Sequence, residues 1–260
     1  MPGDDLAPAA VSRRLGTRFM GQRVIYYPRL DSTMAAARKE AREGAPEGTV
    51  VIAGEQTGGR GRLQRIWLSP PGNIALSVIL YPEAASLPYL VMLAALGVVR
   101  SIEAVTGLTA QIKWPNDVLI NGKKVCGILT GSEFKRDRLS YAVIGTGINV
   151  ALRAADFPEI AATASSLNEE AGSQVSRLEL VRRLLVEMEG LYLTLPDGEP
   201  VYRAWRERLV TLGKTVRVTS GSSRLEGVAE SVDGDGALRL RQPDGTLARI
   251  VAGDVSLRDR

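Results

Sequence analysis

One segment of this chain, SLPYLVMLAALGVVRSIEAVTG at residues 86–107, has apolar residues on nearly every side of a predicted helix. A helix that is hydrophobic all round must be covered on every face. Ser86 is a typical N-cap, and Gly107 is typical of a helix end. Uninterrupted apolar runs fall short of the roughly 20 residues that cross a bilayer, so we expect this helix inside a protein core.

Other segments supply elements that can cover it. The sequence DST before an alanine-rich run predicts a helix that ends at Gly44. A capping box at 176–179 predicts a helix to about Leu193, and a further helix ends near Gly213. Apolar and β-branched runs predict strands at 23–28, 49–56 and 72–82, and within 108–134 and 139–150.

The character of the chain changes at about residues 210–213. Beyond that point, short strands joined by GDG and PDG turns predict a small β-barrel appended to an α/β body. Residues 1–22, rich in Pro, Gly and Ala, are predicted to be a tail. We therefore divide the chain into a tail (1–22), a catalytic body (23–212) and a C-terminal barrel (213–260).

The chain contains one cysteine, Cys126, and no histidine. This composition excludes an internal disulfide, a zinc site of the ordinary N/S type and a Ser-His-Asp or Cys-His nucleophile. Any proton transfer falls to Asp, Glu, Lys, Tyr or water. We expect Cys126 to be a small core residue rather than a nucleophile. The N-terminus lacks the pattern of a secretory signal, so a reducing cytoplasm is the expected location.

The stretch GEQTGGRGRLQR, residues 54–65, gathers three arginines and four glycines. Glycine backbone N–H groups and arginine side chains suit a phosphate or a carboxylate. The stretch is neither a Walker A loop nor a dinucleotide fingerprint, and a solvated loop is an equal alternative. The net charge of +4 suggests an acidic or phosphorylated partner, but no Lys/Arg block supports nucleic-acid binding.

Charged residues also surround a rigid Trp-Pro pair in KWPND, residues 113–117. Lys113 and Asp117 lie four positions apart, which favours charges that face a ligand over a plain turn between strands.

After the hairpin turn predicted by Asn121-Gly122, alternation directs Lys123 and Lys124 to opposite faces of a strand. An inward lysine requires an anion, and we expect Lys123 to be the outward one. The glycines of GTGINV, residues 145–150, allow either close approach to a flat ligand or a bulge.

Taken in order, DST, GEQTGGRGR, KWPND, GKKVCGIL and GTGINV, followed by a short barrel, resemble the catalytic and C-terminal parts of biotin–protein ligases. The resemblance covers nearly the whole chain from about residue 23. It implies an α+β fold with a central mixed β-sheet flanked by helices and a small C-terminal SH3-like β-barrel. It also implies a reaction in which biotin and MgATP give biotinoyl-5′-AMP and pyrophosphate. A lysine of a biotin carboxyl-carrier domain then displaces AMP.

The resemblance implies a role for each matching residue. The catalytic residues would be Arg62, Lys124 and Asp117, with Asp117 orienting Mg²⁺ or the incoming amine. The biotin-binding residues would be Ser32, Thr33, Met34, Gln56, Arg60, Gly61, Arg62, Lys124 and Gly127. The ATP-binding residues would be Arg60, Arg62, Arg65, Trp67, Lys113, Asn116, Asp117 and Asn149. The loop at 58–65 would be a lid that becomes ordered around its ligand.

Two residues depart from the family pattern. Met34 stands where the family usually has Asn, and Gln64 stands where the loop often has a second glycine. The segment before residue 23 is too short for the DNA-binding domain of two-function members, so we expect a ligase that binds neither DNA nor a membrane, as a monomer or homodimer. The alternatives are a lipoate–protein ligase and a non-catalytic module that binds a carrier protein.

Overall fold

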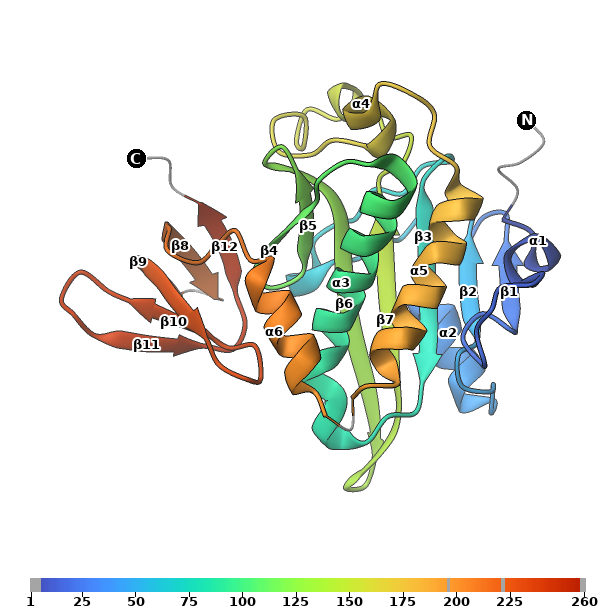
Figure 1. Ribbon diagram of the computed structural model, residues 1–260, viewed down its shortest axis with the longest axis horizontal. Helices are drawn as coiled ribbons and strands as arrows, with labels where there is room; N and C mark the ends of the chain where they lie inside the picture. Colours follow the sequence, from blue (N-terminus) through green and yellow to red (C-terminus); the bar gives the residue numbers. More distant parts are fainter. Residues whose placement is uncertain (1–5, 196, 221–222, 258–260) are drawn as a thin grey trace.

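The computed structural model describes residues 6–195, 197–220 and 223–257. Its centre is a seven-stranded sheet in the order β1-β2-β3-β7-β6-β5-β4 (Figure 1). Strands β1 and β2 run parallel and the other neighbouring pairs are antiparallel, which confirms the mixed sheet. The strands are β1 (Val24–Tyr27), β2 (Val50–Ala53), β3 (Ile74–Leu80), β4 (Gln111–Lys113), β5 (Asp117–Ile120), β6 (Lys123–Lys135) and β7 (Arg138–Ile148).

Helices cover both faces of this sheet (Figure 1). Helix α2 packs on one face against β2, β3 and β7, whereas α3 packs on the other against β5, β6 and β7. Helices α5 and α6 pack in turn on α3. The helices are α1 (Pro8–Ser12), α2 (Thr33–Arg42), α3 (Leu87–Thr106), α4 (Leu167–Ala171), α5 (Arg177–Tyr192) and α6 (Glu199–Glu207), with short 3-10 turns at Arg62–Gln64, Ala84–Ser86 and Ala154–Asp156.

Helix α3 is the buried core helix that the apolar segment predicts. By length and composition, Ala84–Thr106 could also cross a membrane, contrary to the sequence expectation. In this fold it is enclosed instead, because residues from Leu90 to Ile102 pack between the sheet and α5. Gly107 ends the helix in the left-handed conformation as expected, but the Ser86 side chain does not cap it.

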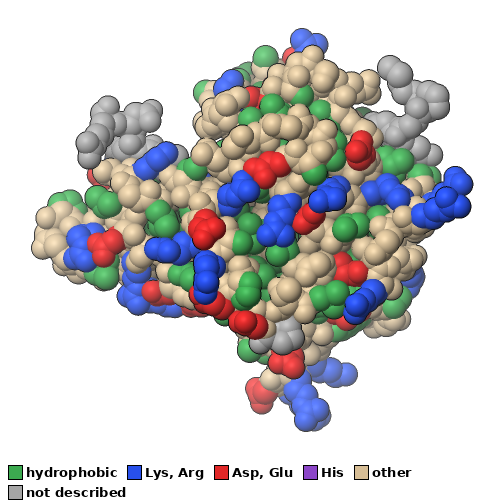
Figure 2. Space-filling view, viewed as in Figure 1, with side chains coloured by type: hydrophobic (Ala, Val, Ile, Leu, Met, Phe, Trp, Pro, Cys, Tyr) green, Lys and Arg blue, Asp and Glu red, His purple; other side chains and the backbone are tan. Residues whose placement is uncertain are grey.

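The solvent side of this layer carries charges of both signs in mixture (Figure 2). Arg100 of α3 and Arg183 of α5 both reach Glu187, at 3.5 Å and 2.6 Å between nitrogen and oxygen. Exposed pairs of this kind contribute little to stability, so the packing of α5 on α3 depends mainly on buried apolar side chains.

The N-terminal segment is not a tail within the described residues. Glu189 of α5, 5% exposed, accepts hydrogen bonds from the backbone N–H groups of residues 18–20. Arg182 donates to backbone carbonyls between residues 10 and 14. Because a buried carboxylate needs such donors, the segment and α5 fix each other. Its buried apolar side chains are Leu6, Val11, Leu15 and Met20.

A second, five-stranded antiparallel sheet follows, in the order β11-β10-β9-β8-β12, and is compatible with an SH3-like domain (Figure 1). Its strands are β8 (Thr215–Ser220), β9 (Ser223–Val232), β10 (Leu238–Arg241), β11 (Leu247–Ile250) and β12 (Asp254–Leu257), of which β12 was not predicted. The predicted turns place Gly236 and Gly245 at positive φ. Helix α6 ends at Glu207, short of the predicted Gly213.

Candidate active site

A row of small residues crosses the α2 face of the central sheet and ends in two charged residues, Asp117 and Lys113. Directly paired residues on neighbouring strands point to the same face. The row runs from β2 to β4 through Ala53, Ala75, Gly147, Gly127, Asp117 and Lys113. Two adjacent glycines leave the backbone bare at its centre, so a flat group can approach the sheet closely there.

A β-bulge brings Lys124 to this same face. Val118 pairs with Cys126 whereas Leu119 pairs with Lys124, so one extra residue of β6 lies between the two pairs. Lys124 and Gly127 are three positions apart, and in a regular strand they would face opposite sides. Here a Cβ atom on Gly127 would lie only 3.3 Å from the Lys124 ammonium nitrogen. Lys123 is exposed, as predicted.

Lys124 forms an ion pair with Asp117 at the end of the row. Its Nζ lies 2.6 Å from Asp117 Oδ1, and the two side chains are 32% and 19% exposed. The same ammonium group lies 5.3 Å from the centre of the Trp67 ring, within the range of a cation–π contact. The strand therefore presents a half-buried positive charge, balanced by one carboxylate, beside bare backbone.

The glycine- and arginine-rich loop folds into a small hairpin that reaches this cluster. Gly61 N–H donates to the Arg65 carbonyl, and Trp67 N–H donates to the Gly59 carbonyl. At the tip, the Arg62 guanidinium donates to Asn116 Oδ1 at 3.3 Å. Asn116 in turn donates to the Ile128 carbonyl at 2.7 Å. Arg62 from the loop and Lys124 from β6 thus both approach the N-terminal end of β5.

Left-handed backbone shapes the tip of this loop. Leu63 and Gln64 have φ angles of 53° and 61°, a region that side chains other than glycine adopt at some cost. The family glycine at Gln64 would adopt this conformation without strain. Leu63 and Ile66 are exposed at 56% and 73%, so the hairpin extends into solvent.

The indole of Trp67 packs against the two glycines of the row. A Cβ on Gly147 would lie 2.4 Å from the indole Nε1, and a Cβ on Gly127 would lie 2.9 Å from Cζ3. Glycine is therefore required at both positions while the indole stays there. The flat group that GTGINV was expected to admit is, in this state, a side chain of the protein itself.

Polar side chains gather where α2 begins. Gln56 Oε1 accepts from the backbone N–H and the hydroxyl of Thr33, at 2.9 Å and 3.1 Å. The Thr33 hydroxyl also accepts from Ser77, at 2.9 Å. Ser32 caps α2 by accepting from the Ala35 N–H. These groups can orient a neutral ring that carries N–H and C=O groups.

Met34 packs on the next row of the sheet. A Cβ on Gly145 would lie 2.7 Å from the Met34 sulfur, and Gly145 pairs with Ser77 of β3. The thioether therefore fills the position beside the Thr33–Gln56 pair with an apolar group.

Four other residues singled out in the sequence surround this cluster or lie in the core beneath it. Asn149 is 4% exposed and donates to the Ser165 carbonyl at 3.1 Å, so its amide supports the backbone near Lys124. Arg60 lies on the exposed part of the hairpin, as does Arg65. Buried Cys126 has its pKa raised by burial, which disfavours the thiolate. Within the described ranges, His, Cys, Asp and Glu side chains form no group of three that could hold a metal ion.

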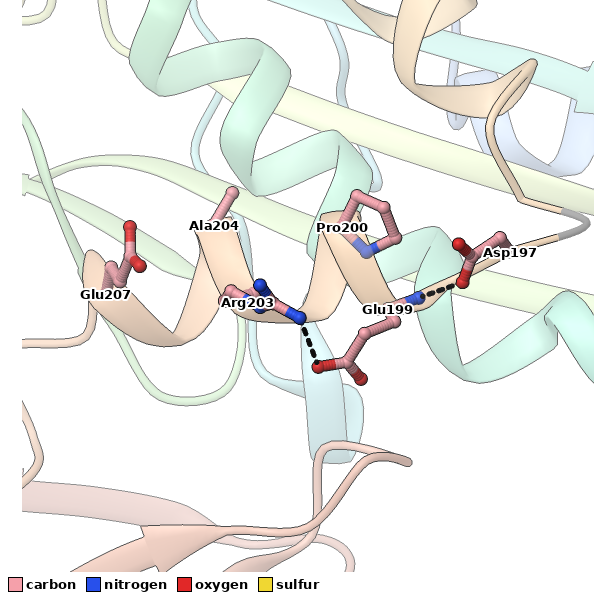
Figure 3. Close-up of a pocket in the computed structure, with 6 residues that line it drawn as sticks. All are labelled: Asp197, Glu199, Pro200, Arg203, Ala204 and Glu207. Carbon is pink, nitrogen blue, oxygen red and sulfur yellow. Dashed lines mark hydrogen bonds and ion pairs between the residues drawn. The ribbon is translucent and has the colours of Figure 1, made fainter.

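Two surface hollows lie away from this cluster. The one in Figure 3, of about 320 Å³, is lined from Asp197 to Glu207, beside and along α6. The other, of about 510 Å³, lies among Leu15, α3 and α5. Neither contains a residue of the predicted site. We place the candidate site at Lys124 because positive charge, bare backbone and polar side chains converge there, which neither hollow offers.

Sequence reasoning missed Ser77, Gly147 and the two alanines of the row. Ser77 stands in an apolar strand, and only its position opposite Gly145 brings it near Thr33. Gly147 belongs to GTGINV, whose pattern alone does not place it beside Lys124. Alternation along β3 and β7 could have placed them on one face, but only the strand order shows that β3 and β7 are neighbours.

Family models match two parts of the chain. Residues 26–149 match the biotin/lipoate A/B protein ligase family, and residues 211–258 match the biotin protein ligase C terminal domain. The chain is 38% identical over 258 residues to the bifunctional ligase/repressor BirA of Bacillus subtilis, covering 97% of this chain and 79% of that protein. It is 35% identical over 226 residues to the biotin–[acetyl-CoA-carboxylase] ligase of Paracoccus denitrificans, covering 84% and 93%.

Solved structures show the same similarity. The biotin protein ligase from Aquifex aeolicus in complex with biotin and ATP superposes with a TM-score of 0.72 at 27% identity, covering 92% of this chain and all of that one. The biotin protein ligase from Leishmania major in complex with biotinyl-5-AMP has a TM-score of 0.61 at 26% identity, covering 88% and 99%.

Proposed function

This chain belongs to the biotin protein ligase family, and we propose that it joins biotin to a lysine of a biotin carboxyl-carrier domain. The reaction passes through biotinoyl-5′-AMP, with release first of pyrophosphate and then of AMP. The observation that supports the proposal is that Lys124 pairs with Asp117 while Arg62 donates to Asn116, so that the two cations contact adjacent residues at the start of β5.

The first step brings two anions together, because the biotin carboxylate must attack the α-phosphate of ATP. Its oxygen forms a bond to phosphorus while the bond to pyrophosphate breaks. Lys124 supplies positive charge at the carboxylate and then at the acyl-phosphate oxygen, and Arg62 supplies it at the phosphate. Fixed charges that meet negative charge as it builds often contribute more to the rate than any other effect in such reactions. Thr33 and Gln56, whose hydrogen bonds to each other fix their positions, would hold the ureido ring at the other end.

The second step requires a neutral amine. The carrier lysine attacks the acyl carbon, the bond to AMP breaks, and the amine loses a proton. The chain contains no histidine, so Asp117 or water accepts that proton. Asp117 pairs with Lys124 at 2.6 Å in this state. Engagement of Lys124 by the acyl phosphate would leave the Asp117 carboxylate available to the amine.

Magnesium is proposed to enter with ATP rather than to occupy a site built by the protein. Mg²⁺ is commonly held by one or two carboxylates together with substrate phosphates. Asp117 offers one such carboxylate beside Lys124, and this donor fits a magnesium ion bound mainly through phosphates. When bound, the ion offsets charge on the phosphates. We further propose a cytoplasmic protein that acts as a monomer or homodimer.

Incubation with biotin, MgATP and a carrier domain, followed by intact-mass analysis of the carrier, tests the proposal. We expect one biotinyl group on one lysine, only when both biotin and ATP are present. Replacing biotin with lipoate tests the alternative acid, and we expect no product. A carrier bound without ATP and left unmodified would support a non-catalytic module instead.

A further inference from the structure

Trp114 connects the two sheets of this protein. Its side chain is 1% exposed, and its indole Nε1 donates to the Gly236 carbonyl at 2.8 Å. Its backbone N–H donates to the Thr211 hydroxyl at 2.9 Å, and Thr211 is fully buried. Gly236 belongs to the turn between β9 and β10, so one residue of the KWPND segment is bonded to the C-terminal sheet.

That turn sits firmly on the helices of the catalytic body. A Cβ on Gly236 would lie 2.9 Å from the Met92 methyl group of α3, so the backbone approaches the helix closely. The Tyr202 hydroxyl of α6 donates to the Val232 carbonyl at 2.7 Å. The Gly236 carbonyl, which accepts the hydrogen bond of the Trp114 indole, is therefore held in place by the contacts of its turn with α3 and α6.

Strand β4 is fixed by the segment that leads from α6 into the C-terminal sheet. Ile112 N–H donates to the Arg208 carbonyl, and Val210 N–H donates to the Ile112 carbonyl, both at 2.9 Å. The chain then passes through Trp114 to Asn116 and Asp117, which contact Arg62 and Lys124 on the site side. The five residues of KWPND thus lie between the C-terminal sheet and the candidate site.

We propose that Trp114 is a positioning residue, through which docking of the C-terminal sheet sets the place of Asn116 and Asp117 and thereby the use of ATP. The inference rests on the proposed function. It concerns ATP rather than biotin because Thr33 belongs to α2 and Gln56 to the segment after β2, and the hydrogen bonds of Trp114 reach neither. A small displacement of a positioning group can cost a large factor in rate.

The chain offers a matched control for this residue. Trp205 of α6 is also 1% exposed and lies in the same junction, 3.9 Å from a Cβ on Gly236. Its indole Nε1 is buried and has no hydrogen-bond partner among the described residues. Trp114→Phe and Trp205→Phe therefore remove similar volume from one interface, but only the first removes a hydrogen bond.

The experiment measures biotin-dependent ATP–pyrophosphate exchange for both variants. Leaving the Gly236 carbonyl unpaired is expected to lower kcat/KM for ATP by about tenfold in Trp114→Phe, with KM for biotin unchanged. Trp205→Phe is expected to keep both parameters. Thr211→Val, which removes the other hydrogen bond of Trp114, is expected to repeat the ATP-selective loss and serves if Trp114→Phe fails to fold. Equal losses in the two Phe variants, or equal effects on ATP and biotin, would overturn the proposal.

Hydrogen exchange gives a readout that does not need activity. We expect faster exchange at residues 116–120 in Trp114→Phe than in Trp205→Phe, and identical exchange there would overturn the inference. Absence of biotin-dependent ATP–pyrophosphate exchange in the unsubstituted protein would instead contradict the proposed function, so the two failures are distinguishable.

Discussion

Replacing Lys124 with methionine removes the charge on which the adenylation step depends while keeping a long, unbranched side chain. The ammonium group lies 2.6 Å from Asp117 and faces the bare backbone at Gly127. Its loss deletes the positive partner of the biotin carboxylate. It also removes the ammonium partner of Asp117 at 2.6 Å, and the negative charge of Asp117 then repels both anionic substrates more strongly.

The expected size follows from the geometry. Two unit charges about 4 Å apart interact by about 4 kcal/mol at the effective dielectric of a partly exposed site. The Lys124 side chain is 32% exposed, so solvent screening reduces this value. Loss of one charge-assisted contact in a transition state typically costs about 2–4 kcal/mol, or roughly 30- to 1000-fold in rate. We expect the lower half of that range.

Biotin-dependent ATP–pyrophosphate exchange measures this effect, with thermal melting as a check on folding. Lys123→Met is the matched control, because Lys123 is adjacent in sequence and exposed to solvent. We expect Lys124→Met to lose activity at an unchanged melting temperature and Lys123→Met to keep it. If Lys124→Met exchanged pyrophosphate at the rate of the unsubstituted protein, the assignment of this lysine would be wrong.

Four further outcomes are expected. Asp117→Asn should slow transfer from preformed biotinoyl-AMP to the carrier, and transfer at full rate would remove Asp117 as the proton acceptor. Gly147→Ala should abolish ATP–pyrophosphate exchange and change tryptophan fluorescence, because the new methyl group would displace the Trp67 indole. Gly190→Ala, where the new methyl group would meet open space, should change neither measurement. Hydrogen exchange in the loop at 58–65 should slow when biotin and ATP are added together, and equal proteolysis with and without them would contradict a lid. Hydrogen bonds from Arg42 and Tyr141 lower the pKa of the Glu133 carboxyl from 4.5 to about 2. The stabilising contribution of Glu133 is therefore present above pH 4.5 and is lost as the pH falls toward 2. The difference in melting temperature between the unsubstituted protein and Glu133→Gln should close over that interval, and a difference that stays constant with pH would contradict this assignment.

Local signals predicted the elements that begin and end with local hydrogen bonds. Ser32 and Ser176 cap their helices, and Asn121-Gly122 forms the hairpin turn with both residues at positive φ. The N-terminal segment was misassigned because its partners, on α5, lie about 170 residues away in sequence. No pattern within a short window contains that information.

The same distinction holds at the site. Lys124 and Asp117 were identified from short motifs, and their contact at 2.6 Å is consistent with that selection. The bulge that turns Lys124 toward Gly127 depends on strand register, which alternation along one strand cannot provide. The role of Asn149 at the nucleotide stays a prediction; its amide donates to the Ser165 carbonyl, a contact that the motif GTGINV alone does not indicate.

The most direct test of the central claim is a crystal structure of this protein with a hydrolysis-resistant analogue of biotinoyl-5′-AMP. We expect the acyl-phosphate group of the analogue within hydrogen-bond distance of both Lys124 and Arg62, with the biotin ring near Thr33. An analogue bound in a hollow on α5 or α6, or one whose phosphate contacts neither cation, would contradict the account.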